Sequence, residues 1–83
     1  MENIDSLKPG DEVTVTIWGP DNSSLYQSTG NGYHNLATAV KETIDKANLQ
    51  INPEDCVFEI ANRNSGVAHR YRLNAHGHLK LII

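Results

Sequence analysis

Only one segment of the chain repeats apolar residues at helical spacing. Leu36, Val40, Ile44 and Ala47 recur at intervals of four, four and three, which is the stripe of an amphipathic helix. The other apolar segments alternate with polar residues, as half-buried strands do. A chain of 83 residues has room for one hydrophobic core, so the helix must pack on the sheet. The sequence therefore predicts a single α+β domain over residues 1–83.

Alternating β-branched and aromatic residues predict the strands, and Gly, Pro, Asn and Asp between them predict turns. The predicted strands cover residues 13–18, 24–29, 56–61, 67–73 and 78–83. With the helix after the second strand, the order of elements is β-β-α-β-β-β. We expect one helix packed on one face of a mixed sheet of four or five strands, and residues 1–11 to be partly disordered.

Loop length sets the register of the strands that follow the helix. A three-residue loop before the last strand pairs Leu73 with Leu79, and a four-residue loop before the fourth strand pairs Phe58 with His69. Both registers keep the apolar residues on one face. The order of elements is similar to that of β-grasp, ubiquitin-like domains. The sequence does not end in the Gly-Gly tail of conjugated members, so modifier activity is not expected.

Charge is distributed unevenly along the chain. Residues 1–60 hold all ten acidic residues against three lysines, a net charge of −7, whereas residues 61–83 hold four basic residues and no acidic one, a net charge of +4. The basic residues of the second range are Arg63, Arg70, Arg72 and Lys80. The whole chain has a net charge of −3. This balance disfavours nucleic acid as the partner, because phosphate contacts usually call for a basic domain.

Three histidines near the end of the chain raise the question of a metal site. In the predicted sheet, His69 points to the buried face and His78 to the other, at opposite ends of the last hairpin. His76 and His78 alone do not complete a zinc site. We therefore expect no metal, with His69 bonded in the core and the other two solvated.

Cys56 is the single cysteine, so no disulfide within the chain is possible. It is in phase with Phe58 and Ile60, which places it in the core, where a cysteine acts as a small hydrophobe rather than a nucleophile. The sequence contains no P-loop and no hydrolase or metalloprotease motif. We expect no catalytic residue and no cofactor.

The sheet face that the helix leaves open is the candidate binding surface. It carries Trp18, Arg70, Arg72 and Lys80, and the predicted register places Arg72 directly opposite Lys80. Two cations beside an aromatic ring suit a phosphate, a carboxylate or an acidic peptide. The alternative is that Glu59, diagonal to Arg70, pairs with it and the face is merely solvated.

These observations favour a non-enzymatic protein-interaction module that self-associates through the open sheet face or binds another protein. The alternative is a module that binds nucleic acid or another anion through the basic C-terminal hairpin. A small enzyme ranks last, because one helix on one sheet hardly encloses a substrate pocket.

Location follows from what the sequence lacks. No stretch approaches the ~20 apolar residues of a membrane span, so we expect no membrane partner. Met1–Asp5 lacks the apolar run of a signal peptide, so we expect a cytoplasmic protein.

Overall fold

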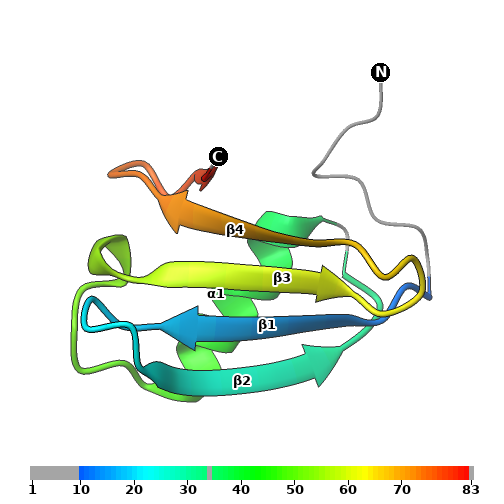
Figure 1. Cartoon of the computed structure of the whole chain (residues 1–83), viewed down its shortest axis with the longest axis horizontal. Helices are drawn as coiled ribbons and strands as arrows, with labels where there is room; N and C mark the ends of the chain where they lie inside the picture. The colour runs from blue at the N-terminus through cyan, green and yellow to red at the C-terminus, as the bar shows by residue number, and fades with distance from the viewer. Residues whose placement is uncertain (1–9, 34, 83) are drawn as a thin grey trace.

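The computed structural model describes residues 10–33 and 35–82 and forms one sheet with one α-helix (Figure 1). Neighbouring strands follow the order β2-β1-β3-β4-β5 across the sheet. The elements are β1 (Val13–Trp18), β2 (Ser24–Gly30), α1 (Leu36–Ala47), a 3-10 turn η1 (Pro53–Asp55), β3 (Val57–Asn62), β4 (Ala68–Leu73) and β5 (Leu79–Leu81). Their succession along the chain is the one that the sequence predicts.

The predicted mixed sheet is wrong, because every pair of neighbouring strands is antiparallel. A mixed sheet, as the β-grasp resemblance implied, would need at least one parallel pair. The difference lies in the inner neighbour of β1, because β3 pairs antiparallel with β1 and β5 lies at the edge of the sheet beside β4.

An asparagine caps each end of α1, the first through its side chain and the second through its backbone. Asn35 precedes the helix with extended backbone, and its Oδ1 accepts the N–H of Thr38 at 2.9 Å. At the other end, Asn48 adopts the left-handed conformation with φ of 51°, and its N–H donates to the carbonyl of Ile44. The helix is therefore bounded by its own sequence before packing contributes.

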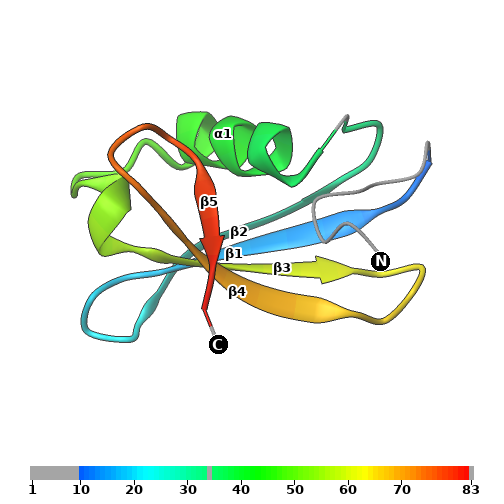
Figure 2. The ribbon, with the colours of Figure 1, turned by 90° about the horizontal axis from the view of Figure 1, so that it is seen from above.

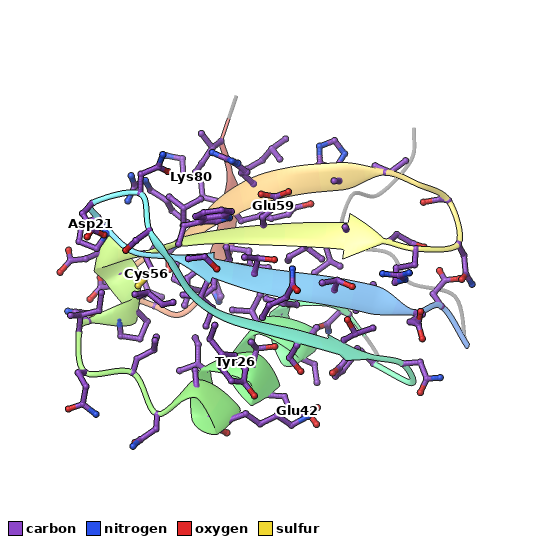
Figure 3. The ribbon with its side chains drawn as sticks, turned by 60° about the horizontal axis from the view of Figure 1, so that its bottom comes forward. Asp21, Tyr26, Glu42, Cys56, Glu59 and Lys80 are labelled. Carbon is purple, nitrogen blue, oxygen red and sulfur yellow. The ribbon has the colours of Figure 1, made fainter. Side chains whose placement is uncertain are left out.

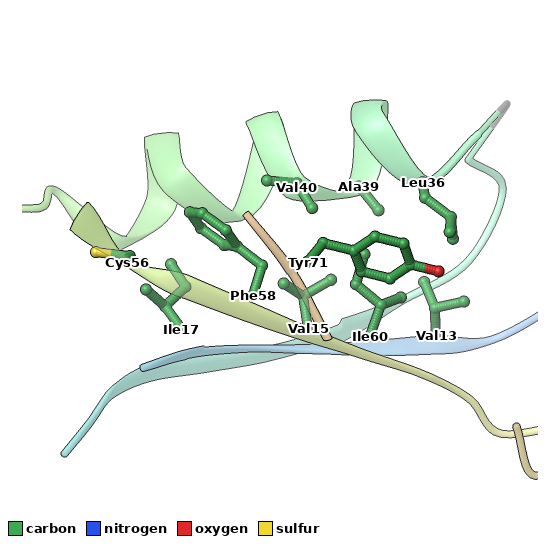
Figure 4. Close-up of a cluster of buried hydrophobic side chains, with 10 residues drawn as sticks. All are labelled: Val13, Val15, Ile17, Leu36, Ala39, Val40, Cys56, Phe58, Ile60 and Tyr71. Carbon is green, nitrogen blue, oxygen red and sulfur yellow. The ribbon is translucent and has the colours of Figure 1, made fainter. Parts of the chain in front are cut away.

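The helix lies across one face of the sheet, and between them is a single hydrophobic core (Figures 2 and 4). Its helix residues are offset slightly from the predicted stripe, since Ala39 and Thr43 are fully buried while Ile44 and Ala47 are only half-buried. The buried apolar set is Val13, Val15, Ile17, Leu36, Ala39, Val40, Cys56, Phe58, Ile60 and Tyr71. Burying each large member contributes about 1.5–3 kcal/mol, which is the main stabilising term for this domain.

The predicted register of the last hairpin is confirmed, with Leu73 opposite Leu79. The predicted register of β3 and β4 is wrong by two residues, because Phe58 pairs with Tyr71 rather than with His69. The turn between them has the expected length but starts one residue later, since Asn62 N–H donates to the carbonyl of Val67. A shift of two residues preserves the face of every side chain.

The start of the described chain is held to the β3–β4 turn. Asp11 accepts hydrogen bonds from the side-chain amides of Asn62 and Asn64, both at 3.1 Å. The sequence predicts partial disorder over residues 1–11, and residues 1–9 of that range lie outside the described ranges. Within those ranges no helix combines the length and apolar character needed to cross a membrane.

Candidate binding face of the sheet

The face of the sheet turned away from α1 is covered by no other element in the described ranges, and we call it the open face (Figure 2). Side chains alternate between the faces, so the strand registers define its members. They are Thr14, Thr16, Trp18, Gln27, Thr29, Val57, Glu59, Ala61, Ala68, Arg70, Arg72 and Lys80. All four predicted site residues are on this face, and Figure 3 labels Glu59 and Lys80 among its side chains.

Trp18, Glu59 and Arg70 form a connected cluster near the middle of the open face. The indole Nε1 of Trp18 donates to Oε1 of Glu59 at 3.2 Å, and Nη2 of Arg70 lies 3.5 Å from the same oxygen. The Arg70 guanidinium carbon lies 5.8 Å from the centroid of the Trp18 ring. Two of these contacts involve the indole and hold it in one orientation, so Trp18 is a pre-positioned rather than a free aromatic ring.

Backbone pairing explains why this cluster forms. Glu59 lies directly opposite Arg70, not diagonal to it as predicted. Asn62 is hydrogen-bonded to β4 and Arg63 to β1, so the backbone of Glu59 faces β1 and the Glu59–Arg70 pair is of the non-hydrogen-bonded type. Side chains are closest in such pairs, which brings the carboxylate to the guanidinium.

Arg72 and Lys80 lie directly opposite each other on β4 and β5, as the sequence predicts. Both are exposed, and among the described residues no carboxylate lies within 4.0 Å of either cation. Like charges in this position are mildly destabilising, by a few tenths of a kcal/mol. The pair therefore offers two donors to an external anion, whereas Arg70 is already engaged by Glu59.

The β1–β2 side of the open face is uncharged. Gln27 Nε2 donates to Oγ1 of Thr16 at 2.9 Å, and the hydroxyls of Thr14 and Thr29 are 2.9 Å apart. Thr16 is only 7% exposed, because neighbouring long side chains cover it. The open face thus changes from neutral and hydrogen-bonded on one side to cationic on the other.

The histidines do not come together. His69 was expected in the core and is exposed, which is a consequence of the two-residue register shift that puts Tyr71 in the core instead. Its ring lies 6.4 Å from that of Tyr71, and the rings of His76 and His78 are also 6.4 Å apart. Within the described ranges no group of three or more His, Cys, Asp or Glu side chains is placed to hold a metal ion.

Cys56 is fully buried in the core, as predicted (Figure 4). Burial raises the pKa of its thiol, and the nearby charge of Asp55 raises it further. The thiol donates to the carbonyl of Asn52, at 3.8 Å. This arrangement favours the neutral thiol, which is the opposite of what a nucleophile requires.

The sequence interpretation missed one ion pair and one hydrogen bond. Arg63 pairs with Glu12 at 3.1 Å. The indole hydrogen bond to Glu59 was also not predicted. Both contacts depend on β3 lying beside β1, a neighbour that the sequence interpretation did not predict.

Comparison of the chain with protein-family models, curated proteins and solved structures finds no match in any of the three. The open face is therefore interpreted from its own chemistry.

Proposed function

We propose that this chain is a non-enzymatic protein-interaction domain that binds an acidic segment of a partner protein on its open face. The observation that carries the proposal is the Arg72–Lys80 pair, two exposed cations opposite each other with no carboxylate nearby among the described residues. A carboxylate between them would gain charge-assisted hydrogen bonds and remove their mutual repulsion.

Trp18 supplies the apolar part of the proposed contact. Its partner in β3 is Val57, so an apolar row leads from the indole toward the cations on β4 and β5. Tryptophan and arginine are the residues that most often dominate binding energy in protein interfaces. Because Glu59 and Arg70 already hold the indole, a partner loses little of its binding energy in ordering it.

The test is an amide NMR titration with a synthetic peptide of alternating Glu and Leu residues, followed at two salt concentrations. We expect shifts at Trp18, Arg72 and Lys80 that diminish as salt rises. The double variant Arg72→Gln/Lys80→Gln should lose them. The matched control Lys41→Gln/Lys46→Gln removes two cations from α1 and should keep them. An open face that stays unchanged throughout would contradict the proposal.

The same titration examines the alternative, a module that binds nucleic acid. The observation in its favour is the net charge of +4 in residues 61–83, which includes the Arg72–Lys80 pair. Against it stand the net charge of −3 and the carboxylate of Glu59 at the centre of the face. If a single-stranded oligonucleotide of equal charge shifts the open face at lower concentration than the peptide, the alternative replaces the first proposal.

A further inference from the structure

β2 is an outer strand of the sheet. Natural edges are shortened, charged, kinked by proline, bulged or covered. The pairing of β2 with β1 is irregular opposite Ile17 and Trp18, at the start of β2, and the rest of the strand has none of these protections. β2 has seven residues, Ser24–Gly30, with no charged residue and no proline. The opposite edge strand, β5, has three residues and carries Lys80 at its centre. The two edges of one sheet therefore differ, and only β2 is long, neutral and available for pairing.

The backbone groups that β2 leaves free can be identified from the neighbouring pairs. The N–H of Arg63 donates to the carbonyl of Glu12 at 2.8 Å, so even-numbered residues of β1 face β3 and odd-numbered ones face β2. In β2, the partners of the even-numbered residues Thr16 and Thr14 are Gln27 and Thr29. Their N–H and C=O groups therefore point away from the sheet, and no hydrogen bond within the described residues uses them.

We propose that β2 pairs antiparallel with β2 of a second copy of this chain, with Gln27 opposite Gln27. In this register the outward N–H and C=O groups of Gln27 pair with those of its symmetry mate, and Thr29 lies opposite Leu25 of the second copy. A register displaced by two residues would place either Leu25 or Thr29 opposite a residue outside β2. The two sheets would join into one continuous sheet with two-fold symmetry.

The second copy is the occupant that fits best, because the strand is compatible with itself. A two-fold axis brings each residue near its own symmetry mate, so a charged strand would repel its copy, and β2 has no charge. In this register Tyr26 lies opposite Ser28 of the second copy and diagonal to its Tyr26, so the two half-buried rings come within reach of each other. This inference concerns the edge and not the open face, and it does not rest on the proposed function.

The test uses two substitutions at one position. Gln27→Ala removes the side-chain bond to Thr16 but keeps the backbone N–H. Gln27→Pro removes the same side chain and also the outward N–H, which no strand of the monomer uses, so an edge proline is tolerated there. Sedimentation velocity should be measured from about 10 μM to about 1 mM, because an interface of one strand pair is small and weak.

We expect the wild-type mass to rise with concentration toward twice the 9.2 kDa of one chain. Gln27→Ala should dimerise with a dissociation constant within about threefold of wild type, and Gln27→Pro should weaken it about tenfold or more. A wild-type protein that stays monomeric over the whole range, or a proline variant that dimerises as well as the alanine variant, would overturn the inference.

A second measurement needs no variant and covers the case in which Gln27→Pro does not fold. Hydrogen exchange of wild-type protein should slow at the amides of Gln27 and Thr29 as concentration rises. The amides of Arg72 and Lys80 face each other inside the sheet and serve as internal controls that do not change. Slowing at residues of β3, β4 or α1, with none at Gln27 and Thr29, would contradict the pairing through β2.

Discussion

Glu59 lies directly across the β3–β4 pair from Arg70, and a single oxygen of its carboxylate serves both that guanidinium and the indole of Trp18. The ion pair is half-exposed, so its Coulombic part is worth little. The greater effect of the carboxylate is geometric, because it holds the indole N–H of the half-buried Trp18 in one direction. Glu59 is thus a positioning residue for Trp18.

Replacing Glu59 should separate these roles. Glu59→Ala removes both contacts, and we expect the free energy of unfolding to fall by about 0.5–1 kcal/mol and tryptophan emission to shift to longer wavelength. Glu59→Gln keeps an oxygen that accepts the indole N–H, so emission should remain close to wild type. Urea unfolding and fluorescence provide both readouts. Equal emission shifts in the two variants would show that the hydrogen bond does not position the ring.

The buried hydroxyl of Thr43 should contribute little to stability. Thr43 is 1% exposed, and its Oγ1 donates to the carbonyl of Ala39 at 2.7 Å, a bond to a group already used by the helix. Thr43→Val replaces the hydroxyl with a methyl group, and we expect a change within about 0.5 kcal/mol. Thr43→Ser keeps the hydroxyl and loses the methyl group, and should cost about 1 kcal/mol. Urea unfolding of both variants decides whether the methyl group or the hydroxyl matters.

Cys56 should react only when the chain unfolds. Its thiol is buried with a raised pKa, so alkylation by iodoacetamide under native conditions should be much slower than that of a free thiol and should accelerate in urea. Native labelling at the rate of an exposed cysteine would mean that the region around η1 opens without global unfolding.

Titration of the Cys56 thiol should also make the free energy of unfolding depend on pH in a defined direction. Since the folded state holds the proton more tightly, the unfolded state loses it first as pH rises through the ordinary pKa of 9.0. The free energy of unfolding should therefore decrease above pH 9.0 until the folded pKa is reached. Other groups also titrate in this pH range. Cys56→Ala is therefore the control, because it removes only the contribution of the thiol. An identical alkaline decline in the variant would count against this assignment.

At low pH, titration of Asp21 should make the free energy of unfolding rise with pH, which is the opposite direction. The hydroxyl of Ser23 donates to Oδ1 of Asp21 at 2.7 Å, and this bond, followed by that from the Ser23 backbone N–H, lowers the pKa of the carboxyl. Its stabilising effect is present above the ordinary pKa of 3.8 and is lost as pH falls through the lower folded value. The Ser23 amide shift should report this titration. A midpoint at or above 3.8 would contradict the hydrogen-bonded turn.

The helix, the strands and most of the core follow from periodicity, because each depends on local spacing. The alternation of Val13, Val15 and Ile17 determines which side of β1 is buried, whatever strands lie beside it. Periodicity also placed Trp18 and Lys80 on the face opposite the helix. These predictions required no knowledge of how the strands are arranged.

The order and register of the strands were harder to predict, because they depend on contacts between residues far apart in the sequence. Nothing in the spacing of Cys56, Phe58 and Ile60 says that β3 rather than β5 lies beside β1. The register of β3 with β4 was decided by the core, where Tyr71 fills space opposite Phe58. The cluster around Glu59 depends on that register and could not be predicted without it.

A second register of the β3–β4 hairpin would also keep its apolar side chains on one face. Sliding β4 by two residues against β3 would put His69 opposite Phe58 and turn no apolar side chain to the other face. Val67, half-exposed at 50%, would move inward by the same slide. The competition between the two hairpins is then a competition between a tyrosine and a histidine for one place in the core. An apolar residue in place of His69 would reduce the free-energy difference between the two registers. Refolding chains would then divide between them.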